Sequence, residues 1–168
     1  IGVRAKAIET TRNLSDYAND DGKFPDRIEN GINDTSAMVS ALSGGPGVVM
    51  IGPGHYRFGN VTIPENVTVI GSGKATIIHC DGSDTIFDQN EVSNWALRDM
   101  ILDGGAQGDW KQRKDLGKSA ILINKSKQWD ISGLIVRNVN GAGVQMLWAY
   151  SAVPWMNNGT ITNVKAMR

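Results

Sequence analysis

Three copies of one apolar pattern in the second half of the chain constrain its fold more than any other feature. The copies span residues 95–102, 129–136 and 159–166, so they begin 34 and 30 residues apart. A shorter apolar run precedes each copy, at residues 86–87, 120–123 and 144–146. Repeats of about 20–50 residues, built from short strands and polar turns, are typical of solenoid proteins. Because the chain has too little helical pattern for leucine-rich or ankyrin repeats, we expect an all-β fold, a single-stranded parallel β-helix.

Stacked rungs of such a coil would lie about 4.8 Å apart, with their inward residues forming continuous apolar columns. Trp95 and Trp129 occupy equivalent positions in two copies and are expected to stack in one of these columns. Residues 44–80 are predicted to start the coil, because glycine, proline or asparagine separates their runs of β-branched residues. These runs are residues 48–51, 61–63 and 67–70.

A short helix is expected directly before the coil, over residues 36–42. Asp34 or Thr35 supplies an N-cap, and Met38, Val39 and Leu42 give the helix an apolar face. The first rung of a strand coil exposes an unpaired edge and an open core. We therefore predict that this helix caps the coil.

The N-terminal segment, residues 3–18, lacks glycine and proline and is predicted to be a second helix. Its apolar or semi-polar positions alternate steps of four and three, as in the seam of a short coiled coil. They are Val3, Ala7, Thr10, Leu14 and Tyr17. One interpretation is an amphipathic helix packed on its own domain, and the other is a neck helix in an oligomer.

We accordingly divide the chain into a helical neck or linker, residues 1–30, and a capping helix with the first rungs of the coil, residues 31–168. The chain begins without methionine and ends in a strand-like run. We interpret it as a C-terminally truncated fragment of a longer protein.

Charge and cysteine content exclude several classes of function. The 17 basic and 17 acidic residues balance, so no cationic face for nucleic acid or an anionic membrane is indicated. No apolar stretch reaches the length of about 18 residues that a membrane span needs. Cys80 is the single cysteine, and its neighbour His79 would point to the opposite face of a strand. We predict no metal site and no cofactor.

The segments around the predicted cap resemble a known superfamily. Residues 33–42, 46–58 and 66–78 place an acidic-threonine cap before a helix, then Pro-Gly-x-Tyr and Gly-x-Gly after successive strands. This order resembles the start of the coil in pectate-lyase-like right-handed β-helix proteins. The resemblance covers residues 31–103 well, whereas the later rungs share only the spacing of their apolar runs. The Asp-Phe-Gly-Ala opening of the superfamily is replaced here by residues 27–31.

The arrangement of a helical segment that leads straight into the coil is similar to that of bacteriophage tailspikes. The sequence is similar in particular to the preneck appendage of small Bacillus podoviruses. The resemblance implies a homotrimer of β-helices on the virion, as a tail or collar appendage assembled in the host cytoplasm. It implies binding, and often cleavage, of host surface polysaccharide or teichoic acid, with the N-terminal segment contacting other tail or collar proteins. The alternatives are a secreted polysaccharide lyase or epimerase of the same superfamily, and a purely structural coil.

Two insertions lengthen the repeats, and insertions in repeat proteins form loops on one face, often the binding face. Residues 104–118 are polar, and we expect them to bind glycan by ring stacking and charge-assisted hydrogen bonds. The residues concerned are Trp110, Lys111, Arg113 and Lys114. Residues 147–156 are apolar and carry Trp148, Tyr150 and Trp155. We expect these three to contact other subunits, together with Val3, Ala7, Leu14 and Tyr17, because exposed aromatic clusters are a liability.

Glycan cleavage would use paired carboxylates, one of them a general acid. The candidates are Asp103, Asp109 and Asp115, and ordinary solvated turn residues are the competing interpretation. Asp99 and Asp103 are expected to lie on one strand face about 13 Å apart, too far to share one water. The active site is expected to lie outside this chain or only partly within it.

Overall fold

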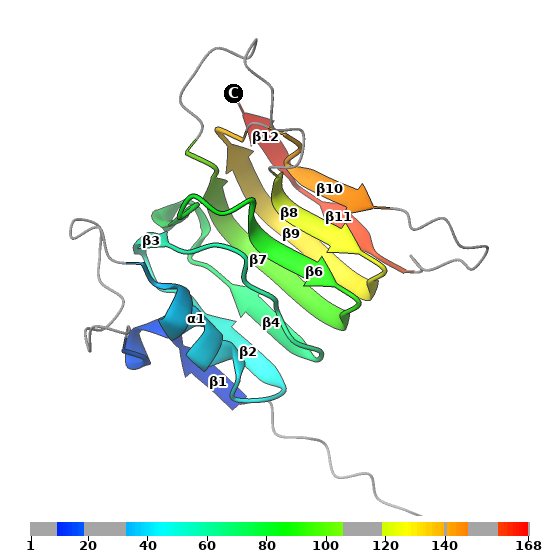
Figure 1. The fold of residues 1–168 in the computed structure, drawn as a ribbon. Helices are drawn as coiled ribbons and strands as arrows, with labels where there is room; N and C mark the ends of the chain where they lie inside the picture. Colours follow the sequence, from blue (N-terminus) through cyan, green and yellow to red (C-terminus); the bar gives the residue numbers. More distant parts are fainter. Residues whose placement is uncertain (1–9, 19–32, 106–118, 140, 148–157, 168) are drawn as a thin grey trace, which may run out of the picture.

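The computed structural model describes residues 10–18, 33–105, 119–139, 141–147 and 158–167, which form a coil of parallel strands (Figure 1). Every strand pair in this part of the chain is parallel. One short α-helix, α1 (Thr35–Leu42), lies among the described residues. The expected parallel β-helix is therefore confirmed.

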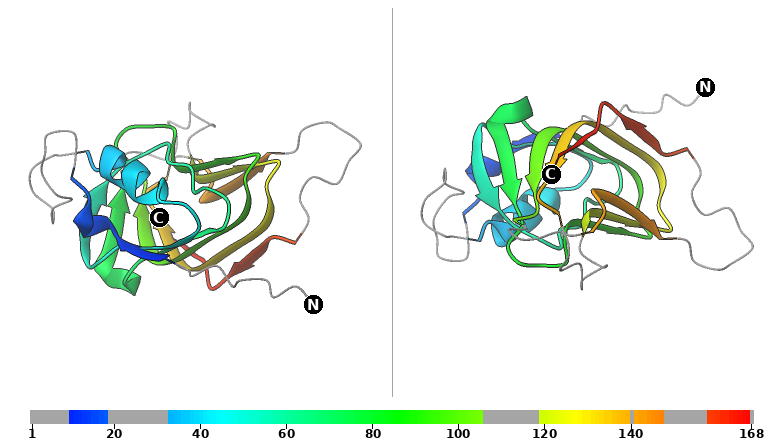
Figure 2. Two further views of the ribbon diagram at one scale, coloured as in Figure 1. Left: turned by 90° about the horizontal axis from the view of Figure 1, so that it is seen from below. Right: turned by 90° about the horizontal axis from the view of Figure 1, so that it is seen from above.

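The strands line three faces of the coil around one core (Figure 2). The first face contains β1 (Thr10–Asn13), β2 (Gly47–Met50), β4 (Val67–Ile70), the first halves of β7 (Ser93–Asp103) and β9 (Lys127–Arg137), and β11 (Thr160–Thr162). The second face contains β3 (Gly54–Arg57), β5 (Thr76–His79), the second halves of β7 and β9, and β12 (Lys165–Met167). The third face contains β6 (Thr85–Asn90), β8 (Ser119–Asn124) and β10 (Val144–Leu147).

Residues with positive φ turn the chain from one face to the next at the same place in successive rungs. The corner inside β7 is Asp99 (φ 56°), the corner inside β9 is Gly133 (φ 66°), and Asn163 (φ 52°) lies between β11 and β12. Glycine and asparagine adopt this left-handed conformation most readily. The expectation that Asp99 and Asp103 share one flat strand face is wrong, because the bend places Asp99 at the corner and Asp103 at the end of the second face.

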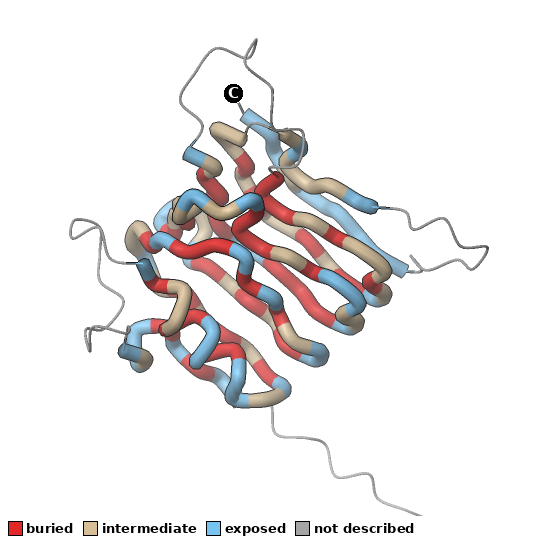
Figure 3. Tube along the Cα trace, viewed as in Figure 1, coloured by how far each residue is buried: buried red, intermediate tan, exposed pale blue. Residues whose placement is uncertain are grey.

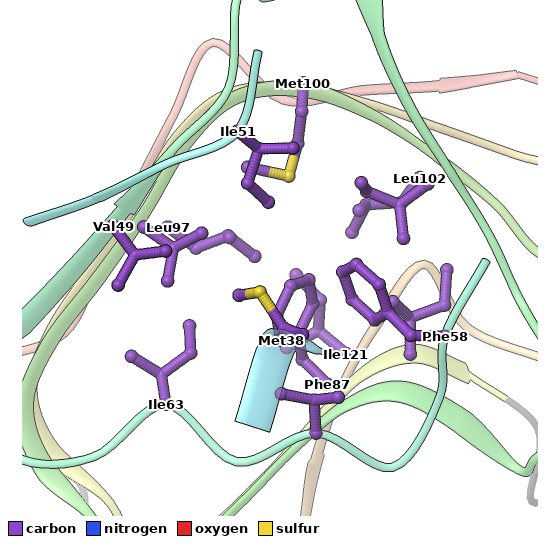
Figure 4. Packing of buried hydrophobic residues seen from close by; sticks show 14 of the residues in the cluster. Met38, Val49, Ile51, Phe58, Ile63, Phe87, Leu97, Met100, Leu102 and Ile121 are labelled. Atoms are coloured by element: carbon purple, nitrogen blue, oxygen red, sulfur yellow. The ribbon is translucent and has the colours of Figure 1, made fainter. Parts of the chain in front are cut away.

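The core consists of inward columns, as the three repeated copies predicted, and Figure 4 shows several of its side chains. Buried positions recur along successive strands of the coil (Figure 3). Leu97 aligns with Val69, Ile131 aligns with Leu97, and Ile161 with Ile131. The rings of Trp95 and Trp129 are stacked, with centroids 6.1 Å apart and planes at 19°, which confirms the expected tryptophan column. Register is held because a slip of one residue would turn every apolar side chain outward.

Helix α1 covers the first end of the coil, which confirms the predicted cap. Its buried residues are Ala37, Met38, Ala41 and Leu42, and Figure 4 shows Met38 among core side chains of several rungs. Val39, which was expected on the apolar face, is 51% exposed. The Asp34 carboxylate accepts a hydrogen bond from the Arg57 backbone N–H (2.8 Å) and so ties the start of the helix to β3.

The predicted N-terminal helix is wrong over residues 10–18. This segment forms β1 and a 3-10 turn, η1 (Leu14–Asp16), and β1 pairs with β2. The exposed edge of β2 offers backbone hydrogen bonds and a core, which outweigh the weak propensity of an isolated short helix. Leu14 is completely buried in the chain's own core, and Tyr17 packs against that core. The assignment of Leu14 to a trimer contact is therefore wrong.

Val3 and Ala7 lie outside the described residues, as do the insertion residues Trp148, Tyr150 and Trp155. The glycan-binding candidates Trp110, Lys111, Arg113 and Lys114 and the carboxylates Asp109 and Asp115 also lie outside them. Of the predicted catalytic residues, Asp103 is the one whose surroundings the structure shows.

Candidate functional site

A column of polar side chains crosses the second face at the ends of its strands. The inward residues Ile78, Leu102 and Val136 are buried in the core. Each is followed by an outward residue, because side chains alternate along a strand. The outward residues align in the order Arg57, His79, Asp103 and Arg137. We call these four residues, together with His55, the polar column.

Asp103 lies at the centre of the polar column and is only 6% exposed. Its carboxylate accepts hydrogen bonds from Arg137 Nε (2.8 Å), Asn138 Nδ2 (3.0 Å) and the Gly105 backbone N–H (3.0 Å). Burial alone would raise the pKa of Asp103, but these hydrogen bonds and the charge of Arg137 lower it overall. Asp103 is therefore ionised at neutral pH and is suited to accept hydrogen bonds, and its lowered pKa makes it a poor general acid and a weak base.

The two histidines of the chain meet on the other side of Asp103. His55 Nδ1 and His79 Nε2 are 2.9 Å apart, and their rings are stacked. His79 Nδ1 lies 3.9 Å from Asp103 Oδ2. A single proton between the two facing nitrogens lets one imidazole donate a hydrogen bond to the other, whereas protons on both facing nitrogens would repel each other. The pair therefore favours a state in which at least one ring is neutral.

The pKa of His79 is lowered from its usual 6.5, chiefly by burial. Asp103 opposes this change, while His55, Arg137 and Arg57 add to it. The unfolded chain consequently binds more protons than the folded chain just below pH 6.5, and stability falls as the pH drops through that region. The carboxylates whose pKa values are lowered lose their contribution only below about pH 3.8, outside this window.

We expect the urea midpoint of the protein to fall as the pH is lowered from about 7.5 to about 5.5, because the unfolded chain then gains a proton at His79 that burial disfavours in the folded chain. The His79→Gln variant should show a flatter dependence over the same range. Chemical unfolding at several pH values, followed by circular dichroism, measures both. Parallel pH profiles for the two proteins would contradict the prediction.

The sequence interpretation named Asp103 but missed its neighbours in the column. The sequence pattern did not single out His55, Arg57 or Arg137 as site residues. The signal available in the sequence was their shared place at the ends of strands in successive rungs. That signal becomes usable only when the strand register is known, since partners such as Asp103 and Arg137 are 34 residues apart.

No group of three or more histidine, cysteine, aspartate or glutamate side chains in the described part of the chain is arranged to hold a metal ion. The described helical segments are too short to cross a lipid bilayer.

The chain has the right-handed parallel β-helix fold, as the structural similarity of its solved neighbours shows. An iota-carrageenase in complex with iota-carrageenan fragments matches 97% of this chain and 38% of its own, with a TM-score of 0.68 and 19% identity. A mannuronan C-5 epimerase A-module of Azotobacter vinelandii matches 92% of this chain and 49% of its own (TM-score 0.59, 18% identity). The ORF18 protein of Geobacillus virus E2 matches 76% of this chain and 26% of its own (TM-score 0.56, 19% identity).

At the level of sequence, the serine protease Pet autotransporter of Escherichia coli O44:H18 is 31% identical over 98 residues, which are 57% of this chain. The chain spans only 7% of the length of that relative and less than half of the carrageenase. No protein-family profile matches the sequence. These similarities establish the β-helix fold that the superfamily resemblance implied.

Proposed function

We propose that this chain is the glycan-binding coil of a phage tailspike or appendage, which attaches the virion to an anionic polysaccharide or teichoic acid of the host surface. The observation that carries the proposal is the polar column, which presents the side chains of Arg57, His79 and Arg137 on successive rungs around one buried carboxylate. Guanidinium groups in such a row form charge-assisted hydrogen bonds with sulfate, phosphate or carboxylate groups.

The similarity to other β-helix proteins supports this proposal. One neighbour is an iota-carrageenase in complex with iota-carrageenan fragments, a second is named as a galactose-4-sulfate galactohydrolase, and a third is a viral protein. A β-helix offers long, regular strand faces along which a polymer can contact several rungs. A virion location and contacts of the N-terminal segment with other tail proteins belong to the same proposal.

Replacing both arginines, as Arg57→Gln and Arg137→Gln, is expected to weaken binding of purified wall teichoic acid or iota-carrageenan about tenfold or more, because two charge-assisted contacts are lost. The affinity of the unchanged protein should fall with salt. Surface plasmon resonance at several salt concentrations measures both, and Lys74→Gln, a lysine in the turn η2 (Gly73–Ala75) away from the column, is the charge control. Equal affinities of the double variant and the control would show that the polar column does not contribute to glycan binding.

A second candidate is a polysaccharide lyase or epimerase, and the mannuronan C-5 epimerase modules among the structural neighbours favour it. Release of reducing or unsaturated ends from alginate, carrageenan or teichoic acid tests it, with Asp103→Asn as the matched variant. Activity that Asp103→Asn abolishes would place catalysis in the polar column. Binding without product release supports attachment alone.

We also propose that the chains associate as a homotrimer, with Trp148, Tyr150 and Trp155 at the contact. Sedimentation velocity of the intact chain tests this association. A trimeric mass would count against a free monomeric enzyme, and a monomeric mass would count against the appendage.

A further inference from the structure

A hollow with a volume of about 460 Å³ lies on the first face, apart from the polar column. Its floor includes outward residues of four successive rungs, Thr68, Ala96, Asp130 and Thr160, which align in the strand register. Its volume falls within the range of about 300–1,000 Å³ that is usual for ligand pockets. The hollow is therefore large enough for a ligand that runs along several rungs.

A row of side-chain amides forms one border of the hollow. Asn66, Asn94, Gln128 and Asn158 all have positive φ where the chain enters the first face, and all four line the hollow. The Asn94 amide donates to the side-chain oxygen of Asn66, so the amides of these two rungs are connected. Each amide offers both a donor and an acceptor, and the row recurs with the spacing of the rungs.

Two tryptophans of the core also border the hollow. Trp95 and Trp129 line it and are 3% and 6% exposed. Their indole N–H groups are buried with the core side chains and have no hydrogen-bond partner among the described residues. The two rings therefore lie beside the hollow as reporters of binding, and the amides and hydroxyls are its accessible hydrogen-bonding groups.

The charges in the hollow cancel. Arg98 Nε donates to Asp130 Oδ2 (2.8 Å), and Thr160 Oγ1 donates to Asp130 Oδ1 (2.6 Å). Burial would raise the pKa of Asp130, but these contacts lower it overall, so the carboxylate stays ionised and neutralises Arg98. An anionic group placed here would meet the carboxylate as well as the guanidinium. Amides and hydroxyls around a balanced ion pair suit an uncharged ligand rich in hydroxyl groups.

We propose that this hollow is a second saccharide site, which binds an uncharged, hydroxyl-rich sugar unit. The inference deepens the proposed function and rests on it, because it assigns the neutral units of the bound glycan to the first face and its charged groups to the polar column. The two sites share strands β7 and β9, since Asp130 and Arg137 both lie on β9, on either side of the corner at Gly133. One polymer with neutral and charged units satisfies both surfaces.

The test uses ¹H–¹⁵N spectra of the intact chain with neutral hexasaccharides of galactose, glucose and mannose as probes. The indole signals of Trp95 and Trp129, assigned with Trp95→Phe and Trp129→Phe, are expected to shift with at least one probe at up to about 10 mM. Thr68→Val with Thr160→Val should weaken that binding about five- to tenfold, because two hydroxyl contacts are lost. Thr11→Val is the matched control, since Thr11 aligns with Val48 and Val48 with Thr68, in the same column outside the hollow.

Shifts of both indole signals that the threonine pair weakens and the control preserves would support the proposal. No shift with any of the three probes, or a shift that the threonine pair leaves unchanged, would overturn it. The Arg57→Gln, Arg137→Gln protein should keep its affinity for the neutral probe while losing the anionic polymer. Failure of the second site and failure of the polar column therefore give different results.

Discussion

Replacing Leu97 with alanine is expected to lower the free energy of unfolding by about 2–5 kcal/mol. Leu97 is completely buried and lies in the middle of an inward column, between Val69 of the rung before and Ile131 of the rung after. Because the rungs stack in register, neighbouring side chains cannot collapse into the space without disturbing the strand pairing. Urea unfolding measures the loss as a lower midpoint at an unchanged slope.

Ile161→Ala is the matched control in the same column. Ile161 aligns with Ile131, but it is 42% exposed, since no described residue packs on its other side. Its truncation should cost less than about 1 kcal/mol, because little packing is lost. Equal costs at Leu97 and Ile161 would contradict the stacked columns. The contrast tests the coil directly, since Leu97 and Ile161 belong to equivalent copies of one sequence pattern.

Asp103→Ala is expected to cost about 2–3 kcal/mol, the second large effect on stability. The substitution leaves three donors without their acceptor, namely Arg137 Nε, Asn138 Nδ2 and the Gly105 backbone N–H. Arg137 is partly exposed and can turn to water, which keeps the expected cost below that of a fully buried ion pair. Asp103→Asn retains one acceptor oxygen and should cost less.

The dependence on pH separates this electrostatic effect from loss of packing. The pKa of Asp103 is lowered in the folded protein, so its carboxylate contributes stability that is present above about pH 3.8 and is lost as the pH falls through the folded value. The difference between the unchanged protein and Asp103→Ala should therefore shrink in acid. Asp84→Ala, at an exposed position, is the control. A difference that persists in strong acid would indicate that Asp103 acts by packing.

The repeats made the coil predictable, but they did not predict the N-terminal segment. The helical pattern of residues 10–18 is a local property, and an isolated helix of that length is marginal. Strand β1 forms because β2 presents an unpaired edge beside an open core, where Leu14 is buried together with α1. A competing partner distant in sequence therefore decided the conformation of this segment. The helix propensity of residues 10–18 depends on these residues alone and therefore does not reflect the pairing with β2.

The sequence alone determined the parallel coil, its repeat register and its helical cap. Apolar residues that recur in every rung are removed from water only when the rungs stack in register and these residues point inward. The tertiary structure alone decided which polar residues meet. Each of Arg57, His79 and Asp103 is 22 to 34 residues from the next member of the row, which ends at Arg137, yet the four residues align on successive rungs. Turn lengths between rungs set that alignment, and the hydrophobic pattern leaves outward positions unspecified. The polar column and the hollow of the first face therefore arise from stacking, which brings one residue of each rung beside its counterpart in the next.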